Sequence, residues 1–187
     1  MIKVVALMVP AVAVLVGLGT SCHVGASQSD VLARFEGSTG LIPVSSVAPP
    51  QNGDLTFANV VQNVVRGVPP SGQPWKIADL RAIVHTDGRI RVVGRGLLLN
   101  GGNLIGQSLV LKVFATVLCD VTPPFVQHST NPDAQQLDPV HLDASGNFRL
   151  DDTLDPVPSA CASPLLLIRG LNNGAWIAAG FPKADRH

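Results

Sequence analysis

The sequence predicts an all-β fold. The expected architecture is an antiparallel β-sandwich, for which an immunoglobulin-like arrangement is one form, and a partly closed β-barrel is the alternative. Short apolar runs of strand length alternate with turn signals, most clearly Thr86-Asp87-Gly88 and Asn172-Asn173-Gly174. No long amphipathic helical pattern occurs. After the N-terminal segment two cysteines remain, Cys119 and Cys161, and one disulfide is common in such domains.

Residues 1–26 have the three parts of a secretory signal peptide. Lys3 precedes an apolar run from Val4 to Leu18, and small residues follow up to Ala26. The run is shorter than the ~20 residues that a membrane-spanning helix needs. We therefore expect cleavage after Ala26, a secreted protein and no membrane span afterwards. The alternatives are an uncleaved anchor, or a lipid anchor at Cys22 in a sequence similar to a bacterial lipoprotein box.

The rest of the chain divides into three parts. Residues 27–56 are rich in Ser, Gly and Pro and predict a loose N-terminal segment. Residues 57–182 are expected to form a single β-sandwich domain, and residues 183–187 a frayed tail. In an oxidising compartment Cys119 and Cys161 would form one disulfide. In the chain-entropy model, closing a loop of that length stabilises the fold by roughly 4 kcal/mol.

The best-specified element is a hairpin of residues 75–85 and 89–99. A two-residue turn would place apolar residues of one strand beside charges of the other on both faces. A three-residue turn at 86–88, with Gly88 in the left-handed conformation, gives one apolar and one polar face. This register places Asp79 directly across from Arg95.

The remaining elements follow from apolar runs and turns. Residues 108–119 predict a strand buried on both faces, and residues 120–139 predict a long polar loop in which His128 is solvated. Residues 140–143 with 147–150, and 165–171 with 175–181, predict two further hairpins. Trp75 and Trp176 are expected in the core.

The polar face of the first hairpin is one candidate site. Its four arginines offer a patch for an anionic partner: Arg81, Arg89, Arg91 and Arg95. The alternative is an ordinary solvated face. The chain has 13 basic and 13 acidic residues and no Tyr, and this face lacks interleaved aromatic residues, so nucleic acid is excluded as the expected partner.

A second candidate site contains carboxylates and one imidazole, a donor set that suits a divalent ion: His141, Asp143, Asp151 and Asp152. The alternative is an ordinary polar strand face. No Gly-x-Ser-x-Gly motif or phosphate-binding loop occurs, so the sequence predicts neither an enzyme nor a cofactor.

Residues 66–75, the hairpin after them and the closing segment 174–180 together resemble small secreted proteins of unknown function. The resemblance implies export and a β-rich domain, and it carries no catalytic or binding residue. We expect a non-enzymatic surface or envelope interaction module whose partner is an extracellular protein or an anionic envelope component. The alternatives are a small-ligand or metal-binding module at one of the two candidate sites, and a hydrolase with a dispersed active site.

Overall fold

The structure of the protein is a computed structural model that describes residues 30–46, 60–130 and 140–183. The predicted signal peptide, residues 47–56 of the predicted loose segment and the tail beyond Lys183 lie outside these ranges. In the described part of the chain, no helix has the length and apolar character that crossing a bilayer requires.

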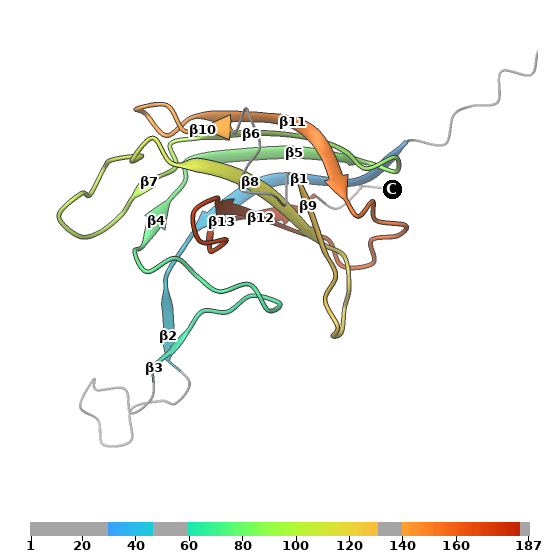
Figure 1. Ribbon diagram of the computed structural model, residues 1–187, viewed down its shortest axis with the longest axis horizontal. Coiled ribbons are helices and arrows are strands. Elements are labelled where there is room, and N and C mark those ends of the chain that lie inside the picture. The colour runs from blue at the N-terminus through green and yellow to red at the C-terminus, as the bar shows by residue number, and fades with distance from the viewer. Residues whose placement is uncertain (1–29, 47–59, 131–139, 184–187) are drawn as a thin grey trace, which may run out of the picture.

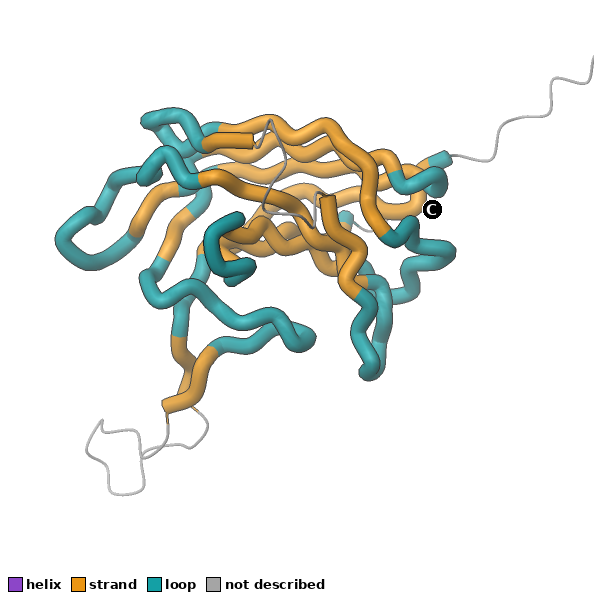
Figure 2. The backbone as a smooth tube through the Cα atoms, viewed as in Figure 1, coloured by secondary structure: helices purple, strands orange, loops and turns teal. Residues whose placement is uncertain are grey.

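The described residues form short antiparallel strands and no helix (Figures 1 and 2). The strands are β1 (Val31–Gly40), β2 (Val44–Ser46), β3 (Val60–Gln62), β4 (Trp75–Lys76), β5 (Asp79–His85), β6 (Arg89–Arg95), β7 (Leu98–Leu99), β8 (Lys112–Leu118), β9 (Gln127–Thr130), β10 (Val140–His141), β11 (Phe148–Asp155), β12 (Leu165–Gly170) and β13 (Trp176–Pro182).

Eight of these strands close into a barrel in the order β8-β12-β13-β1-β5-β6-β11-β9, and β9 returns to β8. The all-β antiparallel prediction is confirmed, the sandwich is wrong, and the barrel alternative is correct. The reason is β1, which bonds to β13 on one edge and to β5 on the other. β9 makes the second connection, because it bonds to β11 and to β8, so the two halves of the sheet are joined at both edges.

β1 and β2 both lie within residues 27–56, which the sequence predicts as a loose N-terminal segment, so that prediction is wrong for these two strands. The ladder of β1 with β13 shifts register between Phe35 and Ser38, where Gly37 has a φ of +87°. The bulge interrupts the alternation of apolar and polar residues, and the Ser and Gly residues after it gave the segment a loop-like composition.

The barrel interior is filled by side chains that alternate inward along each strand. On β5 and β6 they include Leu80, Ala82, Val84, Ile90 and Val92, and all five are buried. An eight-stranded barrel has an interior of about the size that side chains can fill, so this interior is a core.

The first hairpin has the predicted geometry. Asp79 pairs with Arg95, and Leu80, Ala82 and Val84 share the buried face. Gly88 has a φ of +86°, and its N–H donates to the His85 carbonyl at 3.0 Å, as the three-residue turn requires. The turns at 144–146 and 172–174 also form. The 165–181 hairpin is confirmed as β12 and β13. The predicted hairpin of residues 140–143 with 147–150 is wrong, because β10 pairs with β8 and β11 pairs with β6 and β9.

The predicted strand at 108–119 is observed as β8, whose residues 113–118 are buried on both faces. The predicted loop at 120–139 contains β9, which pairs with β8 and β11 and is needed for closure. His128 lies on β9 and is buried, not solvated, and its Nδ1 lies 2.7 Å from the Pro156 carbonyl oxygen. Residues 131–139 lie outside the described part.

The segment from residue 63 to 71 covers the outer face of β12 and β13. Trp176 bonds to it through its backbone, to Pro69 and Ser71, and through its indole N–H, which donates to the Asn63 carbonyl at 2.9 Å. Leu167 points away from the barrel interior by strand alternation and is nevertheless fully buried. Trp75 and Trp176 are both in the core, as predicted.

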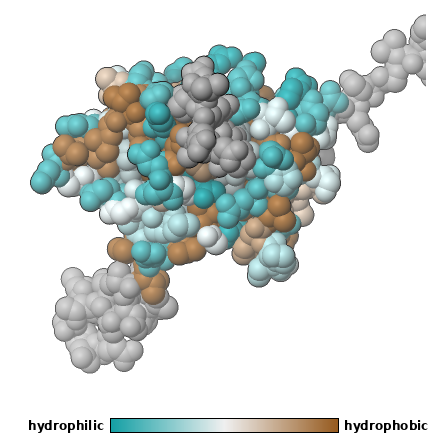
Figure 3. All heavy atoms as spheres, viewed as in Figure 1, coloured by the Kyte–Doolittle hydropathy of each residue, from teal (hydrophilic) through white to brown (hydrophobic). Residues whose placement is uncertain are grey.

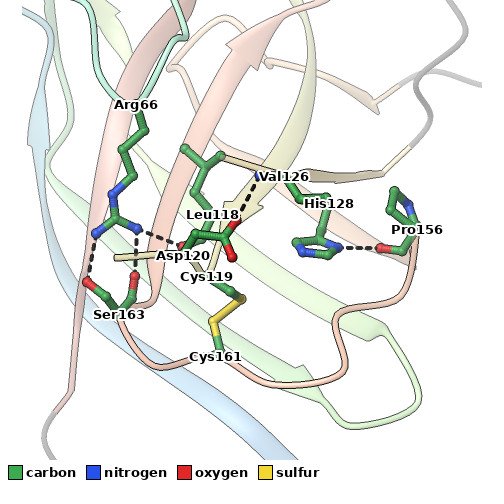
Figure 4. Close-up of a disulfide and its surroundings, with 9 residues drawn as sticks. All are labelled: Arg66, Leu118, Cys119, Asp120, Val126, His128, Pro156, Cys161 and Ser163. Carbon is green, nitrogen blue, oxygen red and sulfur yellow. Dashed lines mark hydrogen bonds between the residues drawn. A yellow bond between two sulfur atoms is a disulfide. The ribbon is translucent and has the colours of Figure 1, made fainter. Parts of the chain in front are cut away.

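A guanidinium anchors this covering segment beside the disulfide (Figure 4). Arg66 donates to the Leu118 carbonyl at 3.0 Å and to the carbonyl and hydroxyl oxygens of Ser163, both at 2.7 Å. The predicted disulfide is present between Cys119 and Cys161, next to those two acceptors. The bridge and the guanidinium therefore hold the end of β8, the approach to β12 and the covering segment together.

Candidate functional site

The polar face of the first hairpin is the centre of a larger four-stranded outer surface. Strand register places charged and aliphatic residues in two rows across β1, β5, β6 and β11. One row contains Arg34, Ile83, Arg91 and Asp151, and the next contains Glu36, Arg81, Val93 and Arg149. Opposite residues in antiparallel strands lie on the same face, so all eight side chains point outward together.

A groove with a volume of about 290 Å³ lies on this surface over β1, β5 and β6. Its charged lining consists of four cations and one carboxylate: Arg34, Arg81, Arg91, Lys183 and Glu36. Ile83 and Val93 contribute a half-buried aliphatic floor between them. Lys183 reaches the groove because its backbone N–H bonds to the Arg34 carbonyl, which extends the β1–β13 ladder by one step.

Three of the four cations have a carboxylate neighbour. Arg91 Nε and Nη2 contact Asp151 Oδ2 at 2.9 and 2.8 Å. Arg81 Nε lies 3.6 Å from Asp79 Oδ2. Lys183 bonds to Glu36, and this hydrogen bond and positive charge lower the pKa of the Glu36 carboxyl.

Arg34 differs from the other three cations of the groove. It is exposed, and no carboxylate within the described ranges forms an ion pair with it. Exposed ion pairs contribute little to stability, so an incoming anion can compete with Asp151 or Glu36 for its partner cation at small cost. Within the described ranges, Arg34 can bind an anion without breaking an ion pair.

The structure divides the four arginines predicted from the sequence. Arg81 and Arg91 line the groove, whereas Arg89 and Arg95 lie on the same face outside it. Arg89 Nε donates to Asp87 Oδ2 at 2.6 Å within the turn, and this contact lowers the pKa of the Asp87 carboxyl. Arg89 is therefore occupied with the turn, and Arg95 lies across from Asp79.

Sequence reasoning missed Arg34, Glu36 and Lys183. The signal was present in the alternation of β1, where Ala33 and Phe35 point inward and Arg34 and Glu36 point outward. Reading that stretch as a loose segment removed both residues from consideration.

The metal-like group does not assemble. Among the described residues, no three His, Cys, Asp or Glu side chains lie close enough together to hold a metal ion. Each member of the group has a local role instead. His141 Nδ1 lies 3.4 Å from the Val110 carbonyl oxygen, Asp151 pairs with Arg91, and Asp152 accepts the N–H of Thr153 at 2.7 Å.

Asp143, the fourth member of that group, closes the 143–147 turn. Its Oδ1 accepts the backbone N–H groups of Ser145 and Asn147, both at 2.8 Å, and its Oδ2 accepts the Asn147 side chain at 3.0 Å. These hydrogen bonds, chiefly the backbone one from Asn147, lower the pKa of the Asp143 carboxyl. A metal ion bound to the Asp143 carboxylate would displace the hydrogen-bond donors that form this turn.

The groove offers binding groups and few reactive ones. Its described lining contains no hydroxyl, thiol or imidazole side chain. Guanidinium groups hold phosphate, sulfate and carboxylate oxygens with charge-assisted and often bidentate hydrogen bonds. This arrangement suits recognition of an oxyanion next to aliphatic surface.

Comparisons with known proteins give no relative for this fold and groove. No protein-family model matches the chain, no curated protein matches it, and no solved structure matches it.

Proposed function

We propose that the protein is an exported, non-enzymatic binding module that holds an anionic partner in the groove of β1, β5 and β6. The observation that carries this proposal is the convergence of four cations around an aliphatic floor, with Arg34 free of any ion pair to the rest of the described chain. The partner presents phosphate, sulfate or carboxylate groups.

Export is part of the proposal and rests on two features. Residues 1–26 have the pattern of a signal peptide. The Cys119–Cys161 disulfide suits an oxidising compartment. An anionic component of the cell envelope or an extracellular polymer would meet the protein there.

The shape of the groove favours part of a larger partner over a small enclosed ligand. Buried small-molecule sites enclose most of their ligand, whereas this groove lies on the outer face of a sheet and most of its cations are more than half exposed. Cations spaced in two rows across neighbouring strands match a repeating anion better than a single one. The aliphatic floor at Ile83 and Val93 would contact the apolar part of such a partner.

The test is calorimetric titration of the purified protein with a sulfated polysaccharide and, separately, with inorganic phosphate. We expect Arg34→Gln to weaken polysaccharide binding about tenfold, because losing one charge-assisted hydrogen bond costs about 1.5 kcal/mol or more. The matched control is Arg149→Gln, since Arg149 is also an exposed arginine on this face and lies outside the groove lining. Equal losses in the two variants would show that the groove has no special role, and undetectable binding of both probes would refute the proposal.

A further inference from the structure

The loop between β7 and β8, which lies outside the groove lining, exposes an unusual amount of aliphatic surface. Between β7 and β8, four large side chains are 46–61% exposed: Leu104, Ile105, Leu109 and Val110. Figure 1 places this loop at the left edge of the molecule, where Figure 3 shows hydrophobic atoms exposed among hydrophilic ones.

The loop is held in place by its own backbone. The N–H of Leu99 donates to the Gln107 carbonyl at 2.9 Å, and the N–H of Gly106 donates to the Leu99 carbonyl at 2.8 Å. The buried Ser108 hydroxyl accepts the Val110 N–H at 3.2 Å. The fold thus presents these aliphatic side chains on an ordered scaffold.

Two of the exposed residues also have strained backbones. Leu109 and Val110 have φ values of +56° and +48°, in the left-handed region that β-branched residues in particular avoid. Strain of this kind persists only where surrounding structure imposes it, and it concentrates at functional sites. In this loop two of the four residues that expose aliphatic side chains are therefore held in a strained conformation.

The chain that forms the loop and its flanking strands is basic, and the one described carboxylate next to the loop in the backbone ladder, Asp143 after Leu142, is occupied by its own turn. The sequence contains no Asp or Glu from Gly88 to Cys119. Exposed Lys76 lies on β4, which pairs with β7 at the base of the loop, and exposed Lys112 begins β8 directly after it. We call the loop of residues 100–111, with β4 and the start of β8 at its base, the arm. It combines an aliphatic tip with two lysines at its base.

We propose that this loop docks the protein on a membrane surface rich in anionic lipids. The four aliphatic side chains enter the boundary between headgroups and acyl chains, and Lys76 and Lys112 contact the phosphates. A second copy of the chain is a poorer occupant, because symmetric contact between two such arms brings the same lysines together. The proposal uses none of the groove residues and stands or falls independently of the proposed function.

The test places a fluorescent reporter in the loop of the full 187-residue chain. In Ile105→Trp the new indole is expected to shift its emission to the blue and to be quenched by brominated lipid on vesicles of equal parts phosphatidylglycerol and phosphatidylcholine. The matched control is Ile42→Trp, because Ile42 is 68% exposed and lies before β2, outside this arm. The native Trp75 and Trp176 are buried and common to both variants.

The reporter is local, so binding of the chain through residues 1–26 would not produce its signal. A second set of variants carries the reporter as Leu104→Trp. In that background we expect Ile105→Asp to weaken vesicle binding at least tenfold and Ile42→Asp to leave it unchanged. No shift of Ile105→Trp on anionic vesicles, or an equal shift of Ile42→Trp, would overturn the proposal. A shift that grows with protein concentration in the absence of vesicles would assign the loop to self-association and would overturn it as well.

Discussion

Gly94 is the position where the filled interior of the barrel can be tested most directly. A Cβ at Gly94 would overlap the Phe148 ring, clashing with Cε1 and Cζ and lying 2.9 Å from Cδ1. Gly94 and Phe148 are directly paired across β6 and β11, and the ring is buried in the core. The ring is rigid and enclosed, so it cannot move aside as the end of a flexible side chain can.

The expected effect of Gly94→Ala follows from two opposing contributions to the free energy of unfolding. Overpacking a core costs about 1–3 kcal/mol. Reduced entropy of the unfolded chain returns about 0.4–1 kcal/mol. We expect a net loss of about 1–2 kcal/mol, measured by urea unfolding with tryptophan fluorescence as the readout.

Gly180→Ala is the matched control, because its Cβ would meet Leu80 Cδ2 at 2.9 Å and Leu166 Cδ2 at 3.3 Å, both ends of flexible side chains. We expect the control to lose less stability than Gly94→Ala. Adding Phe148→Leu to Gly94→Ala should give a variant more stable than the sum of the two single effects by about 0.5 kcal/mol or more. A Gly94→Ala protein as stable as the control, or strictly additive single effects, would refute the reasoning.

Two further predictions concern stability. Cys119→Ser with Cys161→Ser should lower the free energy of unfolding by roughly 4 kcal/mol, because the bridge spans 42 residues; urea unfolding measures this, and a loss under about 1 kcal/mol would contradict it. The stabilisation by the Asp143 carboxylate should be complete above its unfolded pKa of about 3.9 and lost as pH falls through its lower folded pKa. The difference in the free energy of unfolding between wild type and Asp143→Asn, measured by urea unfolding across that window, should therefore shrink toward acid pH. A constant difference would argue against the turn as the cause.

The first hairpin could be predicted from the sequence because the evidence for it is local. Alternation of Leu80, Ala82 and Val84 against charged neighbours fixes which face is buried, and the position of Gly88 fixes the turn. Only one register satisfies both, and the pairing of Asp79 with Arg95 follows from it. The same local reasoning found the turn at 172–174.

Barrel closure could not be predicted in this way because it depends on pairings between strands distant in sequence. β8 is apolar on both faces, which fits the centre of a sandwich as well as a barrel strand with a covered outer face. The distinction lies in β1 and β9: β9 is a short polar run, and the alternation in β1 is interrupted by the bulge at Gly37 and followed by Ser, Thr and Gly. The groove was missed for the same reason, because Arg34 and Lys183 reach it only through the register of β1.

The covering segment at residues 63–71 has a consequence for how substitutions in this barrel should be interpreted. In most small barrels an outward side chain is a surface side chain, and exchanging it costs little. Here the rule holds on one side of the barrel only: outward residues of β5 and β6 contact water, whereas outward Leu167 is buried beneath the covering segment. Tolerance to mutation should thus depend on which strand carries a residue, and so on which side of the barrel it lies, more than on whether its side chain points inward or outward. We therefore expect substitutions of outward residues on β5 and β6 to cost less stability than substitutions of Leu167.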